Sequence, residues 1–303
     1  MSSSIAEFKI MKVAICLRPS AYLPEAYAYQ SYLNSKNVEV ELVNDDYYGN
    51  DIDIKLNFLG FSFFSNYKRS FKQIHEYGSL STPPFSFLKD EVKKYFNSTP
   101  DARIFLNPRV HEKFNFINDR PFMYRDMGID KLFFCSNNAK KVYDVVYCGG
   151  ERIGLMENID NLLKFGLKII VVGSFSASFN NHYRNVSNIT FTGKLNRVDI
   201  SKIYQISVAG LNYTPNIFPY NIQTSTKTLE YCAAGLNIIS NQYEWVDQFV
   251  RSYNSKFLWI QNIKSRSDIE SFNYITPDVS NLEWDYLLDK LEFDKFLFRI
   301  CGE

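Results

Sequence analysis

The segment Thr224–Gly235 (TSTKTLEYCAAG) brings anion-binding and hydroxyl-binding residue types to the start of a predicted helix. Three hydroxyl residues open it: Thr224, Ser225 and Thr226. One of the first two is a natural N-cap, and the free N–H groups and positive dipole of a first turn suit a diphosphate. Lys227 adds a cation where helices ordinarily favour acids, and Glu230, one turn further, could accept hydrogen bonds from a ribose. An ordinary βα unit with a Ser/Thr cap is the alternative, and position and spacing alone favour it.

Strands and helices alternate along the chain in two successive runs of similar size. The first run predicts strands at 12–17, 38–43, 53–59, 73–77 and 102–106, with helices at 25–35 and 87–96. The second predicts strands at 143–148, 167–172, 188–192, 208–213, 236–240 and 256–260, with helices between them. Continuous apolar runs such as KVAICL at 12–17 are typical of buried parallel strands. We therefore predict an α/β fold of two Rossmann-like, doubly wound domains that face a cleft.

The second run carries a set of short motifs in a recognisable order. Lys227–Ser240 (KTLEYCAAGLNIIS) resembles the donor-site signature of GT-B glycosyltransferases, particularly family 4, the "glycosyl transferases group 1" superfamily. The other matching pieces are Gly128–Asp130, Tyr147–Arg152 (YCGGER), Phe191–Gly193 with Leu195, and Tyr213–Pro215. The resemblance covers roughly residues 100–260 and implies the GT-B architecture.

The resemblance implies a nucleotide-sugar donor site in the C-terminal half. Its residues would be Gly149, Gly150, Arg152, Gly193, Leu195, Thr224, Ser225, Thr226, Lys227 and Glu230. Glu230 would bind the ribose hydroxyls, the hydroxyl residues the diphosphate, Arg152 the charge of the leaving group, and Gly193 with Leu195 the nucleobase. The sequence departs from the retaining pattern in two respects: Ile222 stands where those enzymes often have a glutamate, and residues 153–160 lack the lysine that often follows the arginine. The stereochemical outcome therefore stays open.

The domain ranges follow from the two runs and the resemblance. A polar stretch near 137–140 separates an acceptor-binding domain, residues 1–138, from a donor-binding domain, residues 139–280. Residues 281–303 have helical apolar spacing, and GT-B folds often end in a helix that crosses back to the first domain. A helix that forms a dimer is the alternative for this segment.

The N-terminal half offers two candidate catalytic residues at the end of a predicted strand. His75 could donate to a sugar hydroxyl, and Glu76 could take the acceptor's proton if the enzyme inverts. A histidine that caps backbone groups and an exposed glutamate are the alternative, and Asp126 is a second acidic candidate. The aromatic and basic segment Gly60–Phe71 suits a membrane surface or a lipid-linked acceptor, or else an aromatic core helix.

Composition narrows the function classes. The net charge of +1 argues against a nucleic-acid partner. The five cysteines are scattered without CxxC spacing, so a reducing cytoplasm fits best, with contact at the inner face of the cell membrane left open. GT-B sites need no metal and the nucleotide sugar is a substrate, so we expect no cofactor. The DxD pattern at Asp51–Asp53 has the form of a metal-binding motif, but we do not interpret it as a metal site because it lies far from the donor motifs.

The resemblance to GT-B glycosyltransferases implies a metal-independent hexosyltransferase. It would move a hexose from a nucleotide sugar, with UDP favoured, to a glycan or lipid-linked glycan acceptor in bacterial surface polysaccharide synthesis, for example of O-antigen. A nucleotide-sugar epimerase of similar architecture and a non-catalytic nucleotide- or glycan-binding relative are the alternatives.

Overall fold

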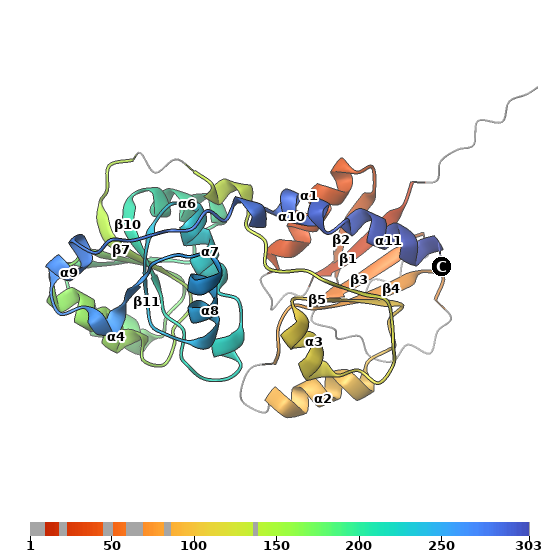
Figure 1. Ribbon diagram of the computed structural model, residues 1–303, viewed down its shortest axis with the longest axis horizontal. Coiled ribbons are helices and arrows are strands. Elements are labelled where there is room, and N and C mark those ends of the chain that lie inside the picture. Colours follow the sequence, from red (N-terminus) through yellow and green to blue (C-terminus); the bar gives the residue numbers. More distant parts are fainter. Residues whose placement is uncertain are drawn as a thin grey trace, which may run out of the picture. The chain divides into compact units, whose positions relative to one another are not determined.

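A computed structural model describes residues 10–17, 23–44, 51–58, 69–81, 86–135 and 139–302 (Figure 1). The chain forms two compact units, one of residues 1–128 with 284–303 and the other of residues 129–283. Each unit contains a six-stranded parallel sheet with flanking helices. The predicted α/β class with two Rossmann-like, doubly wound domains is therefore confirmed.

The first unit is built on a sheet with the strand order β2-β1-β3-β4-β5-β6. Its strands are β1 (Lys12–Leu17), β2 (Glu39–Asn44), β3 (Ile54–Phe58), β4 (Lys72–Tyr77), β5 (Ala102–Phe105) and β6 (Phe122–Tyr124). Its helices are α1 (Pro24–Ser35), α2 (Ser86–Phe96), α3 (Pro108–Phe114), α10 (Trp284–Lys290) and α11 (Phe293–Gly302). Every residue of β3 and β5 is buried, as expected for central parallel strands covered on both faces.

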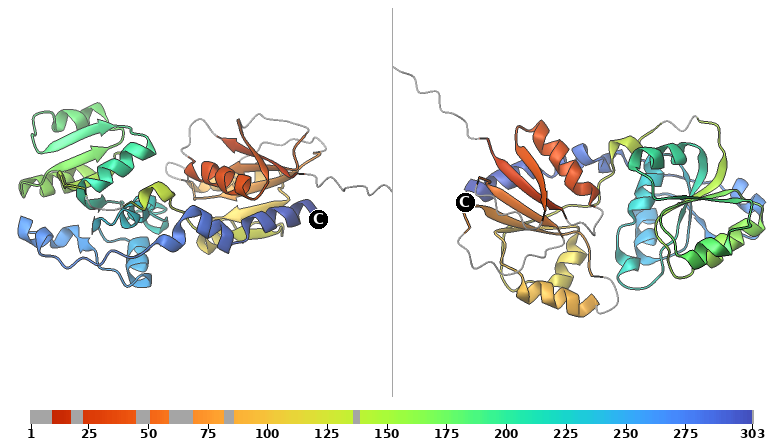
Figure 2. Two further views of the ribbon diagram at one scale, coloured as in Figure 1. Left: turned by 90° about the horizontal axis from the view of Figure 1, so that it is seen from above. Right: turned by 180° about the vertical axis from the view of Figure 1, so that it is seen from behind.

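The two C-terminal helices belong to the core of this first unit. They lie against α1, where Tyr29 packs on both Trp284 of α10 and Phe293 of α11 (Figure 2). Gly128 closes the same contact, since a Cβ there would lie 2.2 Å from the Trp284 ring. The C-terminal helices thus add seven buried side chains to the hydrophobic core that the first strands build: Trp284, Leu287, Leu288, Phe293, Phe296, Leu297 and Ile300.

The second unit is built on a sheet with the order β12-β11-β10-β7-β8-β9. Its strands are β7 (Tyr143–Cys148), β8 (Ile169–Val172), β9 (Ile189–Gly193), β10 (Ser207–Asn212), β11 (Asn237–Ser240) and β12 (Leu258–Trp259). Its helices are α4 (Leu155–Lys164), α5 (Ala177–His182), α6 (Arg197–Gln205), α7 (Thr226–Ala233), α8 (Glu244–Ser252) and α9 (Arg266–Glu270). Counted from β7 this is the dinucleotide-binding order, so the strand order reverses between β7 and β10. Ligands of such sheets bind beyond the carboxyl ends of the strands at that point.

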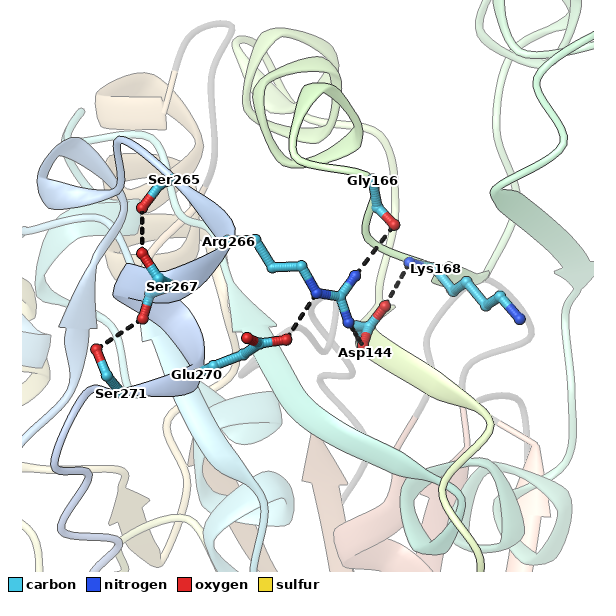
Figure 3. Close-up of polar contacts among 8 residues, drawn as sticks. All are labelled: Asp144, Gly166, Lys168, Ser265, Arg266, Ser267, Glu270 and Ser271. Carbon is cyan, nitrogen blue, oxygen red and sulfur yellow. Dashed lines mark hydrogen bonds and ion pairs between the residues drawn. The ribbon is translucent and has the colours of Figure 1, made fainter.

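The chain after β12 is fixed at the opposite, amino edge of this sheet. Arg266 donates to the Gly166 carbonyl at 3.2 Å and forms ion pairs with Asp144 at 3.0 Å and Glu270 at 2.7 Å (Figure 3). The second Asp144 oxygen accepts from the Lys168 backbone N–H at 2.7 Å. These contacts hold α9 and the segment before it against the sheet.

No helix in the described part of the chain is long and apolar enough to cross a membrane.

Candidate functional site

The N-terminus of α7 stands where β10 ends, at the reversal of strand order in the second unit. Ser225 is its N-cap, and the Ser225 hydroxyl accepts from the Thr228 backbone N–H at 3.3 Å and from the Thr228 hydroxyl at 2.9 Å. The same hydroxyl donates to Asn212 Oδ1 at 2.9 Å. Its donor and both of its acceptor sites are therefore used inside the protein. Ser225 orients the helix, and its side chain has no hydrogen bond left for a phosphate.

A buried polar network fixes this helix start to the sheet. Asn212, the last residue of β10, is 3% exposed and donates to Ser240 Oγ at 2.8 Å and to Tyr243 Oη at 3.0 Å. Asn212 thus joins the end of β11, the residue before α8 and the cap of α7. Because each member has a partner, the network positions α7 rigidly.

The first turn of α7 keeps a backbone N–H group available at the helix N-terminus. The Ser225 cap accepts from Thr228, while the amide of Thr226 donates to no acceptor among the residues that the structure describes. Thr224 and Thr226 are half-buried beside it. A helix N-terminus of this kind binds phosphate through N–H groups and the positive end of the dipole.

Glu230 is the buried acid of the site. Its side chain is 3% exposed, and Oε2 accepts from Lys227 Nζ at 2.6 Å and from Tyr204 Oη at 3.0 Å. Burial, followed by the charge of Glu230, raises the pKa of Tyr204 well above its ordinary value, so Tyr204 stays a hydrogen-bond donor. In the described part of the chain, Oε1 has no hydrogen-bond partner and keeps its capacity to accept. A pair of ligand hydroxyls could use that capacity.

The loop after β7 is held from both sides. A Cβ at Gly173 would lie 1.9 Å from the Gly149 carbonyl oxygen, so only glycine permits this approach of β8 to the loop. Gly154 has φ +83, and a Cβ there would lie 2.2 Å from Tyr213 Oη. Tyr213 donates to the Ile153 carbonyl at 2.9 Å. The loop is therefore locked onto the ends of β8 and β10.

Arg152 projects from this loop as an exposed cation. Its guanidinium lies 5.6 Å from the ring centre of Tyr220, in the turn η2 (Tyr220–Ile222) that precedes α7. Burial raises the pKa of Tyr147 to about 12 against the opposing charge of Arg152, and Tyr147 donates to the Gly150 carbonyl at 2.7 Å. The structure thus brings Arg152 to the segment that leads into α7.

Gly193 and Leu195 lie two strands away, at the end of β9. Gly193 has φ +71 and accepts from the Gly173 N–H at 2.9 Å, while Leu195 is half-buried. Within the described part of the chain, a Cβ at Gly150 or Gly193 would meet nothing within 4 Å, so both glycines border open space there. Their predicted contacts with a donor stay predictions.

The first unit buries both candidate catalytic residues. Glu76 accepts from Tyr29 at 3.0 Å and forms an ion pair with Arg125, and both charged side chains are fully buried. Burial raises the pKa of Glu76, and the charge of Arg125 opposes that rise. His75 is also fully buried, with Nδ1 3.4 Å from Tyr77 Oη. These contacts favour a structural role for Glu76 in this conformation.

The remaining candidates of the first unit are partly outside the described residues. Asp126 is exposed and accepts from the Met127 N–H at 2.7 Å. Most of the segment Gly60–Phe71 lies outside the described residues. No three His, Cys, Asp or Glu side chains that could hold a metal come together within the described ranges.

Sequence reasoning did not identify Tyr204, Asn212 or the Ser240–Tyr243 pair. Asn212 left a signal, since it is a polar residue that interrupts the apolar run of β10 at its carboxyl end. No sequence pattern points to Tyr204, because it contacts Glu230 from α6, a helix that precedes β10 in the chain.

No family model matches the chain, and no curated protein matches it. Among solved structures, it is similar to AviGT4, a glycosyltransferase involved in avilamycin A biosynthesis, with a TM-score of 0.62 and 10% identity over 96% of this chain and 98% of the other. It is similar to the Anabaena protein HepE in complex with UDP-glucose, with a TM-score of 0.57 and 10% identity over 96% and 98%. It is also similar to a putative UDP-N-acetylglucosamine 2-epimerase from Listeria monocytogenes, with a TM-score of 0.56 and 10% identity over 95% of this chain and 98% of the other. The chain therefore has the two-domain GT-B fold, and at this identity the likeness concerns the fold alone.

Proposed function

We propose that this protein is a glycosyltransferase that binds a nucleoside-diphosphate sugar at the carboxyl edge of its second sheet. The observation that carries the proposal is the arrangement around α7. There the Thr226 amide and the Lys227–Glu230 pair lie at the point where the strand order reverses, and Arg152 lies against Tyr220 in the turn that leads into α7. A nucleoside diphosphate requires two kinds of protein group, namely groups that bind its phosphates and an acceptor for its ribose hydroxyls.

The chemistry of transfer fits these groups. Negative charge grows on the departing diphosphate, and a helix N-terminus with a nearby arginine stabilises that charge without reorganisation. Glu230 Oε1 accepts from the ribose hydroxyls while Lys227 and Tyr204 hold Oε2. We propose UDP as the nucleotide, a hexose as the sugar, a glycan or lipid-linked glycan as the acceptor, and transfer without a metal ion. Two structures with similar folds support the nucleotide sugar, the HepE complex with UDP-glucose and the transferase AviGT4.

A thermal-shift titration with UDP, GDP, ADP and CMP tests the donor site. One nucleotide should raise the melting temperature of the native protein, because a ligand that binds only the folded state stabilises it by mass action. Glu230→Ala should abolish that shift. Glu112→Ala removes an exposed glutamate in α3 of the other unit and serves as the matched control, which should keep the shift. If no nucleotide stabilises the native protein at millimolar concentration, the proposal is wrong.

A nucleotide-sugar epimerase is the second candidate, and the likeness to the Listeria epimerase favours it nearly as much as the transferase likeness favours transfer. The products distinguish the two. A transferase consumes the nucleotide sugar and glycosylates an added acceptor, whereas an epimerase interconverts the sugar of UDP-N-acetylglucosamine, which proton NMR detects directly. A protein that binds nucleotide and gives neither product would be the non-catalytic relative.

A further inference from the structure

A groove of about 440 Å³ opens on the second unit between α4 and the segment after β12. The segment includes the turn η3 (Ile260–Asn262). Four amide and four apolar side chains line the groove, and none of these described residues is charged. The volume falls within the range of small-molecule sites.

The two amides on α4 each keep one hydrogen-bonding group for a ligand. Asn158 donates through Nδ2 to the Gly154 carbonyl at 2.7 Å, which leaves Oδ1 as an acceptor. Asn161 accepts through Oδ1 from Lys164 at 2.9 Å, which leaves the Nδ2 group as a donor. The internal bonds fix the orientation of both side chains, so the remaining groups are preorganised.

The opposite wall has two amide side chains. Gln261 keeps a group that can bond to a ligand, whereas Asn241 is fully hydrogen-bonded to Thr214. Gln261 donates to Gln242 at 2.6 Å and keeps Oε1 as an acceptor. Asn241 uses both of its groups on Thr214, accepting from its N–H at 3.0 Å and donating to its carbonyl at 2.7 Å. The groove therefore presents acceptors and a donor together, which suits hydroxyl groups because each hydroxyl both donates and accepts.

The apolar side chains of the groove indicate which class of ligand it can bind. Ile260 and Ile263 are half-buried and Leu162 is buried, which provides an apolar floor between the amides. A phosphate or a carboxylate would meet no charged side chain in the lining, because the neighbouring Lys164 is exposed and donates to Asn161. A purely apolar ligand would leave the amides without partners. A saccharide satisfies both surfaces, because its hydroxyls meet amides and its C–H faces meet the isoleucines. We propose that this groove binds a neutral saccharide.

This site goes beyond the proposed transferase function, because neither Glu230 nor Arg152 lines the groove. Two side chains that line the groove also form hydrogen bonds to loops of the donor site. Asn158 holds Gly154 of the loop after β7, and Asn241 holds Thr214 at the end of β10. A glycan bound here would touch side chains that support both loops of the donor site.

Methyl NMR of the full-length protein tests the proposal, since Ile260 and Ile263 lie in the lining. The δ1-methyl signals of both residues are followed during titration with glucose, galactose, mannose, N-acetylglucosamine, lactose and maltose, with glucuronic acid as the charged comparison. We expect at least one neutral saccharide to shift both signals saturably. The double variant Asn161→Leu/Gln261→Leu should weaken that binding at least about tenfold, which is about 1.4 kcal/mol.

Two further variants keep the outcome unambiguous. Gln248→Leu replaces an amide on α8 outside the groove and should bind like the native protein. Phe165→Trp enlarges a half-buried ring of the lining without removing an amide, and should weaken or abolish binding. The proposal is overturned if no neutral saccharide shifts the two methyl signals at tens of millimolar, if the double variant binds unchanged, or if only glucuronic acid binds. Glu230→Ala should leave saccharide binding intact, which separates this result from the nucleotide titration.

Discussion

Arg125→Met removes one partner of the fully buried ion pair in the first unit. The Arg125 and Glu76 side chains have no exposed surface, and the second Glu76 oxygen accepts only from Tyr29 in the described contacts, at 3.0 Å. The variant leaves a buried carboxylate whose charge only a neutral hydroxyl stabilises. Loss of one partner of a buried pair costs about 3–5 kcal/mol, so we expect the free energy of unfolding to fall by that amount at about pH 8. Urea unfolding followed by circular dichroism measures it.

The loss of stability in Arg125→Met should depend on pH. Burial raises the pKa of Glu76 and the charge of Arg125 lowers it, so removal of Arg125 raises the folded-state pKa further. A carboxyl whose pKa is higher in the folded state contributes stability that is fully present below its unfolded pKa. That contribution is lost as the pH rises through the folded pKa. The unfolding deficit of Arg125→Met should therefore be smallest near and below about pH 4.5, the ordinary value for glutamate, and largest at neutral and alkaline pH.

A second substitution separates charge from packing. Arg125→Met combined with Glu76→Leu removes both charges, and an apolar pair of similar volume should recover most of the lost stability. Lys295→Ala breaks the exposed pair between Lys295 of α11 and Glu292, which directly precedes this helix, and should leave unfolding unchanged. A deficit below about 1 kcal/mol in Arg125→Met, or one that does not change with pH, would refute the reasoning.

Three further predictions concern the second unit. Asn212→Leu breaks the polar network under the Ser225 cap, so it should lower stability by about 1–3 kcal/mol and weaken the nucleotide-induced thermal shift; an unchanged shift would contradict the positioning role. Tyr204→Phe removes the hydroxyl that donates to Glu230, so calorimetric titration with UDP should give weaker binding, and equal affinity would show that Lys227 alone orients the carboxylate. Gly154→Ala should destabilise the protein by more than Gly166→Ala in thermal unfolding. Both glycines have positive φ, at +83 and +73, but only a Cβ at Gly154 would strike Tyr213.

Hydrophobic periodicity predicted the architecture because two consecutive βα runs leave few topologies open. The helix expected within Thr224–Gly235 is observed as α7 (Thr226–Ala233), where the Ser225 cap and Gly235 mark its two ends. The sequence reasoning missed α3, although Asn107 caps it by accepting from the Val110 N–H at 3.0 Å and Pro108 occupies its first turn. Both are recognised start signals, but a helix of seven residues shows too few apolar repeats for periodicity to detect.

The donor site could be predicted only where its residues are close in sequence. Ser225 as the cap and Glu230 one turn later follow from spacing on a single helix. Asn212, Ser240 and Tyr243 come together because β10 pairs with β11, and no spacing in the sequence encodes that register. The pairing of the strands therefore brings together the residues that support the site, and patterns in the sequence do not reveal that pairing.

Glu76 and Glu230 show why residue type and burial do not identify a site by themselves. Each is a buried glutamate that accepts from a tyrosine and pairs with a cation. Both Glu76 oxygens are engaged and its partner Arg125 is fully buried, so the pair has no surface from which a ligand could approach. Among the residues that the structure describes, Glu230 bonds through Oε2 alone, and its partner Lys227 keeps 31% of its side chain exposed. What distinguishes a binding carboxylate from a core carboxylate is thus the remaining acceptor capacity and a partner that reaches solvent.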